Sequence, residues 1–181
     1  MRSLPDPGFA GDDGTTPPQL AEVLTAHAKG PQGEHHRTLA VLQDCRLLVP
    51  VVAVLGEVEH DEQGLAHDKS SDMAAVLMKG RDGRLALLAF TGTDAMSRWD
   101  PAARPVPVTA RQAADAALQD GAAALLVDVA GPTMLVVEGE DLQSLAQGFR
   151  LLRTGDRWGW VRRGAVEEGR EVSDPGGGPA R

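Results

Sequence analysis

Two pairs of short apolar runs, each joined by a turn, constrain the fold of this chain most. "MAAVLMKG" and "RLALLAF" are joined through Gly80 to Gly83, and "AALLVDV" and "TMLVVEG" surround Ala130, Gly131 and Pro132. A short turn containing Gly between two apolar runs of strand length is a hairpin signal. The sequence therefore predicts two antiparallel hairpins.

Helical segments lie around these hairpins. Apolar residues recur at helical spacing in four segments, and Thr109 is placed to cap the third of them. The segments are 17–30, 33–46, 110–121 and 140–152. The pattern predicts four helices, the last of which buries a face that includes Phe149.

The remaining strands are predicted to be short or interrupted. "RLLVPVVAVL", from Arg46 to Leu55, indicates a buried strand, and Pro50 within it indicates an edge position or a bulge. "RPVPV" is expected to be a short extended piece, because its prolines lack the amide donor. Segregated helices and antiparallel pairs predict an α+β fold, with a mixed, largely antiparallel sheet of two hairpins plus short strands and helices packed on it.

The chain is predicted to hold one domain with loose ends. It has 181 residues, with three Phe, three Trp and no Tyr, so the core must consist mainly of Ala, Val and Leu. The Pro, Gly and Asp content near both ends indicates disorder over residues 1–15 and a flexible tail over 166–181. Residues 16–165 are expected to form the single domain.

Charge and apolar content exclude several classes of partner. The formal net charge of -8 argues against nucleic acid, whose phosphates require clustered Lys and Arg. No apolar run reaches the length needed to cross a bilayer, and the N-terminal residues lack an apolar signal-peptide segment. The single cysteine, Cys45, fits a reducing compartment. We expect a cytoplasmic protein with no membrane contact and no cofactor.

Most candidate catalytic or metal-binding residues have a simpler interpretation. His60 and His67 lie among carboxylates in the loop 57–72, but the spacing matches no zinc or calcium motif, so a solvated loop is favoured. His35 and His36 are adjacent and are expected at the surface. Cys45 precedes an apolar run, where a buried and inert thiol is the common case.

Asp128 and the segment "AFTGTDAMSRWDPAARPVPV" carry the candidate interaction surface. Asp128 lies in an apolar strand, where it is expected to accept bonds from turn amides. In the quoted segment Thr91 or Thr93 can cap a short helical turn, and an indole, an arginine and prolines follow, a mixture common in protein contacts. The interaction candidates are Phe90, Trp99, Arg104, Pro105, Pro107 and Asp128.

Four pieces of the chain together resemble a known family. "RLLVPVVAVLGEVE", "KSSDMAAVLMKGRDGRLALLAFTGTDAMSRW", "ARPVPV" and "DGAAALLVDVAGPTMLVVEGEDLQSLAQG" are similar to the SseB protein N-terminal domain, of the enhanced serine sensitivity family. The resemblance covers about Arg46 to Gly148, and Asp128 is followed by Val129 where a proline is expected. It implies no established catalytic mechanism, so no catalytic residue follows from it.

These observations favour a non-catalytic module that binds another protein or itself, with a slight preference for a homodimer. One alternative is a small metal-dependent hydrolase that uses His60, His67 and nearby carboxylates. Another is a sensory domain with a small-ligand pocket between sheet and helices. The residues alone leave these three functions open.

Overall fold

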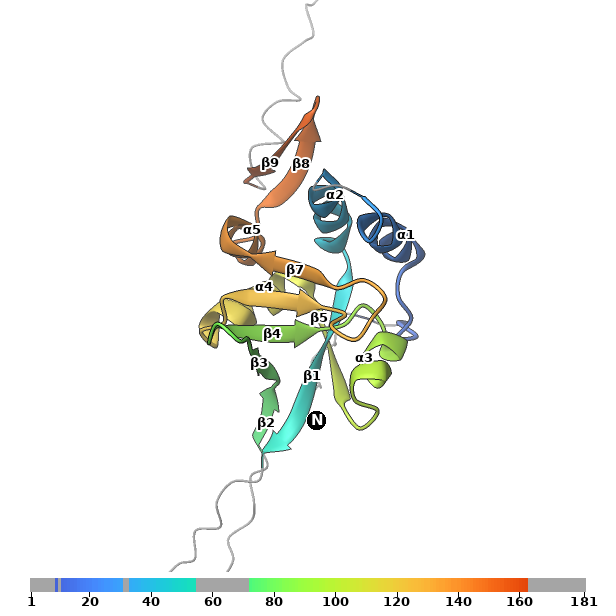
Figure 1. Cartoon of the computed structure of the whole chain (residues 1–181), viewed down its shortest axis with the longest axis vertical. Helices are drawn as coiled ribbons and strands as arrows, with labels where there is room; N and C mark the ends of the chain where they lie inside the picture. The colour runs from blue at the N-terminus through green and yellow to red at the C-terminus, as the bar shows by residue number, and fades with distance from the viewer. Residues whose placement is uncertain (1–8, 10, 31–32, 55–71, 163–181) are drawn as a thin grey trace, which may run out of the picture.

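The computed structural model describes residues 9, 11–30, 33–54 and 72–162, and within them short apolar runs form strands and amphipathic runs form helices (Figure 1). The fold is α+β, as predicted. The strands are β1 (Arg46–Val54), β2 (Asp72–Ala75), β3 (Leu77–Lys79), β4 (Leu85–Ala89), β5 (Arg104–Thr109), β6 (Ala124–Val127), β7 (Leu135–Glu138), β8 (Arg150–Thr154) and β9 (Arg157–Val161). The helices are α1 (Pro18–His27), α2 (Gly33–Leu42), α3 (Thr93–Trp99), α4 (Ala110–Gln119) and α5 (Gly139–Ala146).

Both predicted hairpins are present, and they form a four-stranded sheet in the order β3-β4-β6-β7. β3 pairs antiparallel with β4, and β6 with β7. The two hairpins join through β4 and β6, which run parallel, so the sheet is mixed. The long connection through α3, β5 and α4 provides the crossover that a parallel pair requires.

β1 is the central strand of the second sheet, of order β2-β1-β5, so of the two alternatives predicted for Pro50, an edge position or a bulge, the edge position is wrong. Pro50 is compatible with a central strand because, on the side of β1 away from β5, the neighbouring strand changes next to it from β4 to β2. Leu48 exchanges two backbone bonds of 2.8 Å with Phe90 at the end of β4, and the Pro50 carbonyl accepts from the Val76 N–H. No ladder bond on that side requires a donor from Pro50.

The first arm of the β3–β4 hairpin divides between the two sheets at Val76. Its N–H donates to Pro50 of β1, and its carbonyl accepts from Leu88 of β4. β2 before it pairs with β1, and β3 after it pairs with β4. The predicted single strand is therefore two short strands.

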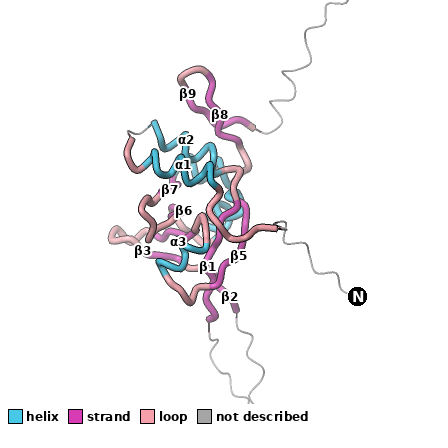
Figure 2. Tube along the Cα trace, turned by 90° about the vertical axis from the view of Figure 1, so that its right-hand side faces the viewer, coloured by secondary structure: helices cyan, strands magenta, loops and turns pink. Residues whose placement is uncertain are grey.

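Helices cover one face of the four-stranded sheet. Leu87, Leu125 and Val137 point into the main core, where the alanines of α4 pack without large side chains. The low aromatic content therefore suits helices that approach the sheet closely. Figure 2 shows α1 and α2 side by side at the end of the molecule where β8 and β9 lie. In the described part of the chain no helix is long and apolar enough to span a membrane.

The last helix is shorter than predicted. α5 ends at Ala146, and Gly148 follows with φ of +79°, a left-handed conformation that terminates helices. Its N–H donates to the Leu145 carbonyl, and the N–H of Phe149 to that of Ser144. Phe149 therefore lies beyond the helix, and residues 150–161 form an unpredicted hairpin of β8 and β9.

Candidate functional site

The Phe90–Trp99 pair forms the inside of the predicted interaction surface. The Phe90 side chain is fully buried, and its ring centroid lies 5.6 Å from that of Trp99. Trp99, at the end of α3, is half-buried and packs on the smaller core cluster of Leu48, Leu88 and Met96. Phe90 is thus a core residue, and Trp99 alone of the two reaches solvent.

Arg104, Pro105 and Pro107 lie along β5 but not on one face. Pro107 is opposite Leu48, which packs in the same cluster as Trp99. Side chains alternate along a strand, so Pro105 shares that face and Arg104 points to the other. Arg104 and Pro105 are exposed, and Pro107 is half-buried. The fold groups the two prolines on the side of Trp99 and separates Arg104 from them.

Asp128 is buried and accepts a bond from a backbone amide, as predicted, but this amide belongs to Thr91 in the bend after β4. It accepts from the Thr91 N–H at 2.9 Å and from the Thr91 hydroxyl at 2.7 Å. Because β4 and β6 are parallel, their carboxyl ends lie side by side and bring the two residues together. Asp128 has φ of 57°, which Asp tolerates better than most residues.

The electrostatics of Asp128 fit a structural link between two strand ends. Burial raises the pKa of Asp128 above its ordinary value of 3.8, and the two bonds from Thr91 act in the opposite direction. Each carboxylate oxygen already accepts a bond from Thr91. Thr91 is therefore not the cap of α3, whose N-cap residue is Gly92.

Arg46 binds the segment that precedes α1. Its buried guanidinium donates to the Thr91 carbonyl at 2.9 Å and to the Thr15 carbonyl at 3.0 Å, and it forms an ion pair with Asp12. The hydrogen bond from Arg46 to the Asp12 carboxylate lowers the pKa of Asp12. Residues 11–15, at the end of the segment predicted to be disordered, are thus bonded to the domain.

Cys45 lies at the junction between α2 and β1, as expected, but it is half-buried rather than buried. Burial raises the pKa of its thiol, the neighbouring Asp44 raises it further, and Arg46 lowers it. The thiol donates to the Val41 carbonyl at 3.3 Å. A raised pKa keeps the thiol protonated, which disfavours a nucleophilic role.

His35 and His36 are not simple surface residues. His35 Nε2 lies 3.1 Å from a carboxylate oxygen of Asp141, and His36 Nε2 lies 4.0 Å from the same oxygen. The Trp160 indole donates to the other oxygen at 2.9 Å, and Trp158 stacks on His36. These contacts attach the β8–β9 hairpin to α2 and α5.

The predicted loop with His60 and His67 lies outside the described residues. Of the range 57–72, only Asp72 falls within them, at the start of β2. Within the described ranges no three or more His, Cys, Asp or Glu side chains are grouped so that they could hold a metal ion. The hypothesis of a metal site in this loop is therefore untested.

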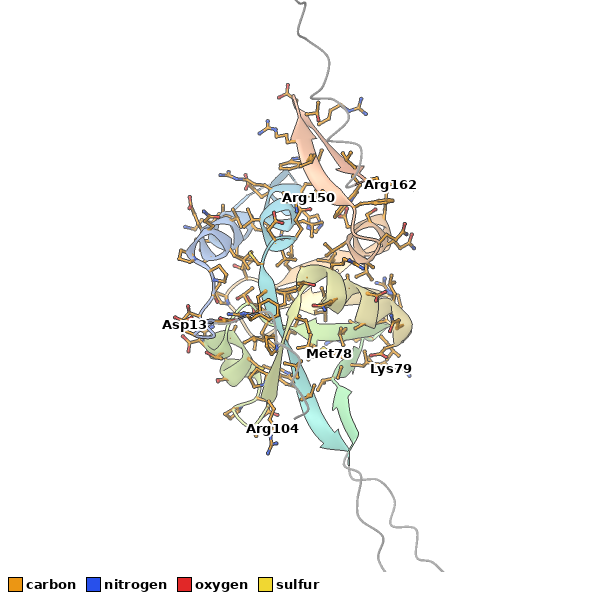
Figure 3. All side chains as sticks on the ribbon, turned by 180° about the vertical axis from the view of Figure 1, so that it is seen from behind. Asp13, Met78, Lys79, Arg104, Arg150 and Arg162 are labelled. Atoms are coloured by element: carbon orange, nitrogen blue, oxygen red, sulfur yellow. The ribbon has the colours of Figure 1, made fainter. Side chains whose placement is uncertain are left out.

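The surface that sequence reasoning missed is the second face of the four-stranded sheet. Its apolar side chains come from all four strands and line a depression of about 530 Å³. We call this surface the open face: Met78, Ala86, Leu126 and Val136. Among the described helices, only α3 packs on this side, over Leu88 and Phe90. In Figure 1 the strands of this sheet face the viewer, whereas α4 lies in front of them in Figure 3.

Charged residues surround part of the open face. Arg84 pairs with Asp82 at 2.6 Å and with Glu138 at 2.9 Å, and Arg81 lies beside them. An apolar centre with a charged rim is typical of interaction surfaces. The sequence gives only a weak signal for the open face. The strands of this sheet carry apolar side chains on both sides, so their pattern does not reveal which face a helix covers.

Comparison with family models gives one result that bears on this site. A model described as the SseB protein N-terminal domain matches residues 20–144, more than half of the chain. The chain belongs to this family. The open face lies entirely within the matched SseB domain, whereas β8 and β9 follow it. Comparisons with curated proteins and with solved structures each found no match.

Proposed function

We propose that the protein is a non-catalytic interaction module that binds an apolar segment of another protein on its open face. The observation that carries the proposal is the difference between the two faces of one sheet. One face is covered by helices along its length, whereas among the residues that the structure describes a helix covers the other face only at the end where α3 packs. Buried apolar surface is the main source of free energy in protein association.

The dimensions of the open face favour a single amphipathic helix as the bound segment. Adjacent strands lie about 4.8 Å apart, so four strands span about 14 Å. An α-helix with its side chains is about 10 Å wide. α3 already shows how a helix packs on this side of the sheet, through Ala95 and Met96. A partner helix would occupy the place beside it.

Two further features support a binding role over a catalytic one. The thiol of Cys45 has a raised pKa, and the Asp128 carboxylate is engaged by Thr91 on both oxygens. A protonated thiol is a poor nucleophile, and both oxygens of the Asp128 carboxylate already accept bonds within the fold. A cytoplasmic location belongs to the same proposal.

Val136→Lys tests the proposal. Val136 lies in the edge strand β7, where a lysine can direct its amine to solvent while the strand remains paired. A partner identified by capture with the wild-type protein is purified, and its affinity for each variant is measured. We expect Val136→Lys to weaken binding at least tenfold.

Leu118→Lys is the matched control, because Leu118 is 38% exposed and lies in α4, on the covered side of the sheet. It should bind the partner as the wild type does, and circular dichroism must show both variants folded. Equal affinity of the two variants would refute the open face as the binding surface. If the wild type and Leu118→Lys are dimeric and Val136→Lys is monomeric, the partner is a second copy of this chain.

A further inference from the structure

A second cavity, separate from the open face, lies where three segments of the helical side meet the N-terminal segment at Phe9. It has a volume of about 290 Å³ and is lined by Phe9, the α2–β1 junction, the start of α4, and the end of α5 with the residues after it. It shares no lining residue with the open face. Its chemistry is distinct, because Arg46, Arg111 and Arg150 all line it in a chain with net charge -8.

The carboxylates near this cavity are already paired. Asp44 makes two bonds of 2.6 Å to Arg150, and these raise the pKa of Arg150. The guanidinium of Arg46 is bound to Asp12. Arg111 also lines the cavity, and among the described residues no carboxylate lies within ion-pair distance of its guanidinium.

Arg111 is positioned by the glycine that ends α5. A β-carbon built on Gly148 would lie 3.4 Å from Cδ of Arg111 and 3.5 Å from its Nε, so the arginine side chain lies along the glycine backbone. Phe149 and Leu145 provide an apolar wall. Arg162 lies over the Phe149 ring, 5.8 Å from its centroid, and adds positive charge nearby.

We propose that this arginine pocket binds a small organic anion that carries a carboxylate or phosphate group. The planar guanidinium of Arg111 matches the geometry of either group, and Arg162 strengthens the local positive potential. The apolar wall receives the carbon part of the ligand, and the volume restricts the ligand to small molecules. Gly148, Phe149 and Arg150 follow the matched family range, so the pocket uses residues beyond the SseB domain.

Titration of the full chain with two probes, inorganic phosphate and succinate, tests the proposal and separates the two anion classes. Amide resonances of Leu145 and Phe149 are followed by NMR, with sodium chloride of equal ionic strength as the reference. We expect saturable shifts with at least one probe and a dissociation constant at least tenfold higher for Arg111→Gln. Saturation with phosphate alone, or with succinate alone, identifies the class.

Arg104→Gln is the control variant, because Arg104 is also exposed but lies at the other end of the molecule from Arg150 and Arg162 (Figure 3). Its affinity for the probes should equal that of the wild type. Shifts that sodium chloride reproduces, or an equal loss of affinity in both variants, would overturn the proposal. Both substitutions replace exposed side chains, so both proteins are expected to fold.

Discussion

Asp128 places a carboxylate in a buried position, and two substitutions separate its charge from its hydrogen bonds. Asparagine keeps an oxygen for the Thr91 N–H and tolerates a φ of 57°. We expect Asp128→Asn to change the free energy of unfolding by less than about 1 kcal/mol. Asp128→Ala should lower it by about 2–4 kcal/mol, because the Thr91 N–H loses its acceptor. Urea denaturation measures both, and equal losses would contradict this role.

The raised pKa of Asp128 also gives the wild type a pH dependence that Asp128→Asn removes. The folded state holds this proton more tightly than the unfolded state, whose pKa is near the ordinary 3.8. The stabilising contribution is therefore present below about pH 3.8 and is lost as the pH rises through the folded pKa. The stability of Asp128→Asn relative to wild type should increase from about pH 3.5 to pH 7. A difference that does not vary with pH would argue against a buried charge.

Asp12 compensates the buried charge of Arg46. Asp12→Ala should destabilise the domain by about 1–3 kcal/mol, because Arg46 keeps only its two carbonyl acceptors and Asp12 is partly screened by solvent. Asp13→Ala is the control, since within the described residues the Asp13 side chain bonds to Thr15, two positions on, and not to Arg46. Thermal unfolding of the two variants should show a clear loss for the first alone. A similar loss of thermal stability in both variants would mean that the conformation of residues 11–15, and not the ion pair with Arg46, contributes the stability.

At the scale of single elements, the capping box of α4 shows sequence and structure in agreement. The Gln112 N–H donates to the Thr109 hydroxyl at 3.1 Å, and the Thr109 N–H donates to the Gln112 side chain at 2.9 Å. Thr109→Ala should cost about 1 kcal/mol of stability. Thr25→Ala, at an exposed position within α1 where the hydroxyl bonds only to the preceding turn, should cost much less. Equal costs in urea denaturation would contradict the cap.

The elements also show which features local patterns can predict. The two hairpins and the Thr109 cap depend on nearby residues, and the sequence predicted them. The position of Pro50 depends on Phe90 and Val76, which are distant in sequence, so the predicted edge position failed. Apolar periodicity extended α5 beyond Gly148, because periodicity alone does not detect the left-handed glycine that ends the helix.

The candidate site was harder to predict than the fold, for the same reason. Composition identified the segment that contains Trp99 and the prolines of β5. The burial of Phe90, however, depends on α3, and that of Asp128 depends on the parallel pairing of β4 with β6. The open face depends on which side of the sheet the helices cover, a tertiary property. Local patterns therefore carry only a weak signal for the open face.

At the scale of the whole molecule, the edge strand β5 is protected from pairing with another chain. Leu48 directs its N–H and carbonyl to Phe90, away from β5. Pro107, which lies opposite Leu48, therefore directs its backbone nitrogen away from β1, to the unpaired side of β5, and Pro105 does the same two residues earlier. Neither can donate a bond there. Replacing both prolines by alanine should increase self-association in light-scattering measurements. An unchanged mass would show that other features protect this edge.

The most direct test of the open face is site-specific photo-cross-linking in cells. A photoreactive amino acid replaces Val136 on the open face in one variant and Leu118 on the exposed side of α4 in the other. We expect a discrete cross-linked protein from position 136 and none from position 118. The same adduct from both positions, or an adduct from position 118 alone, would contradict the assignment of the open face as the binding surface.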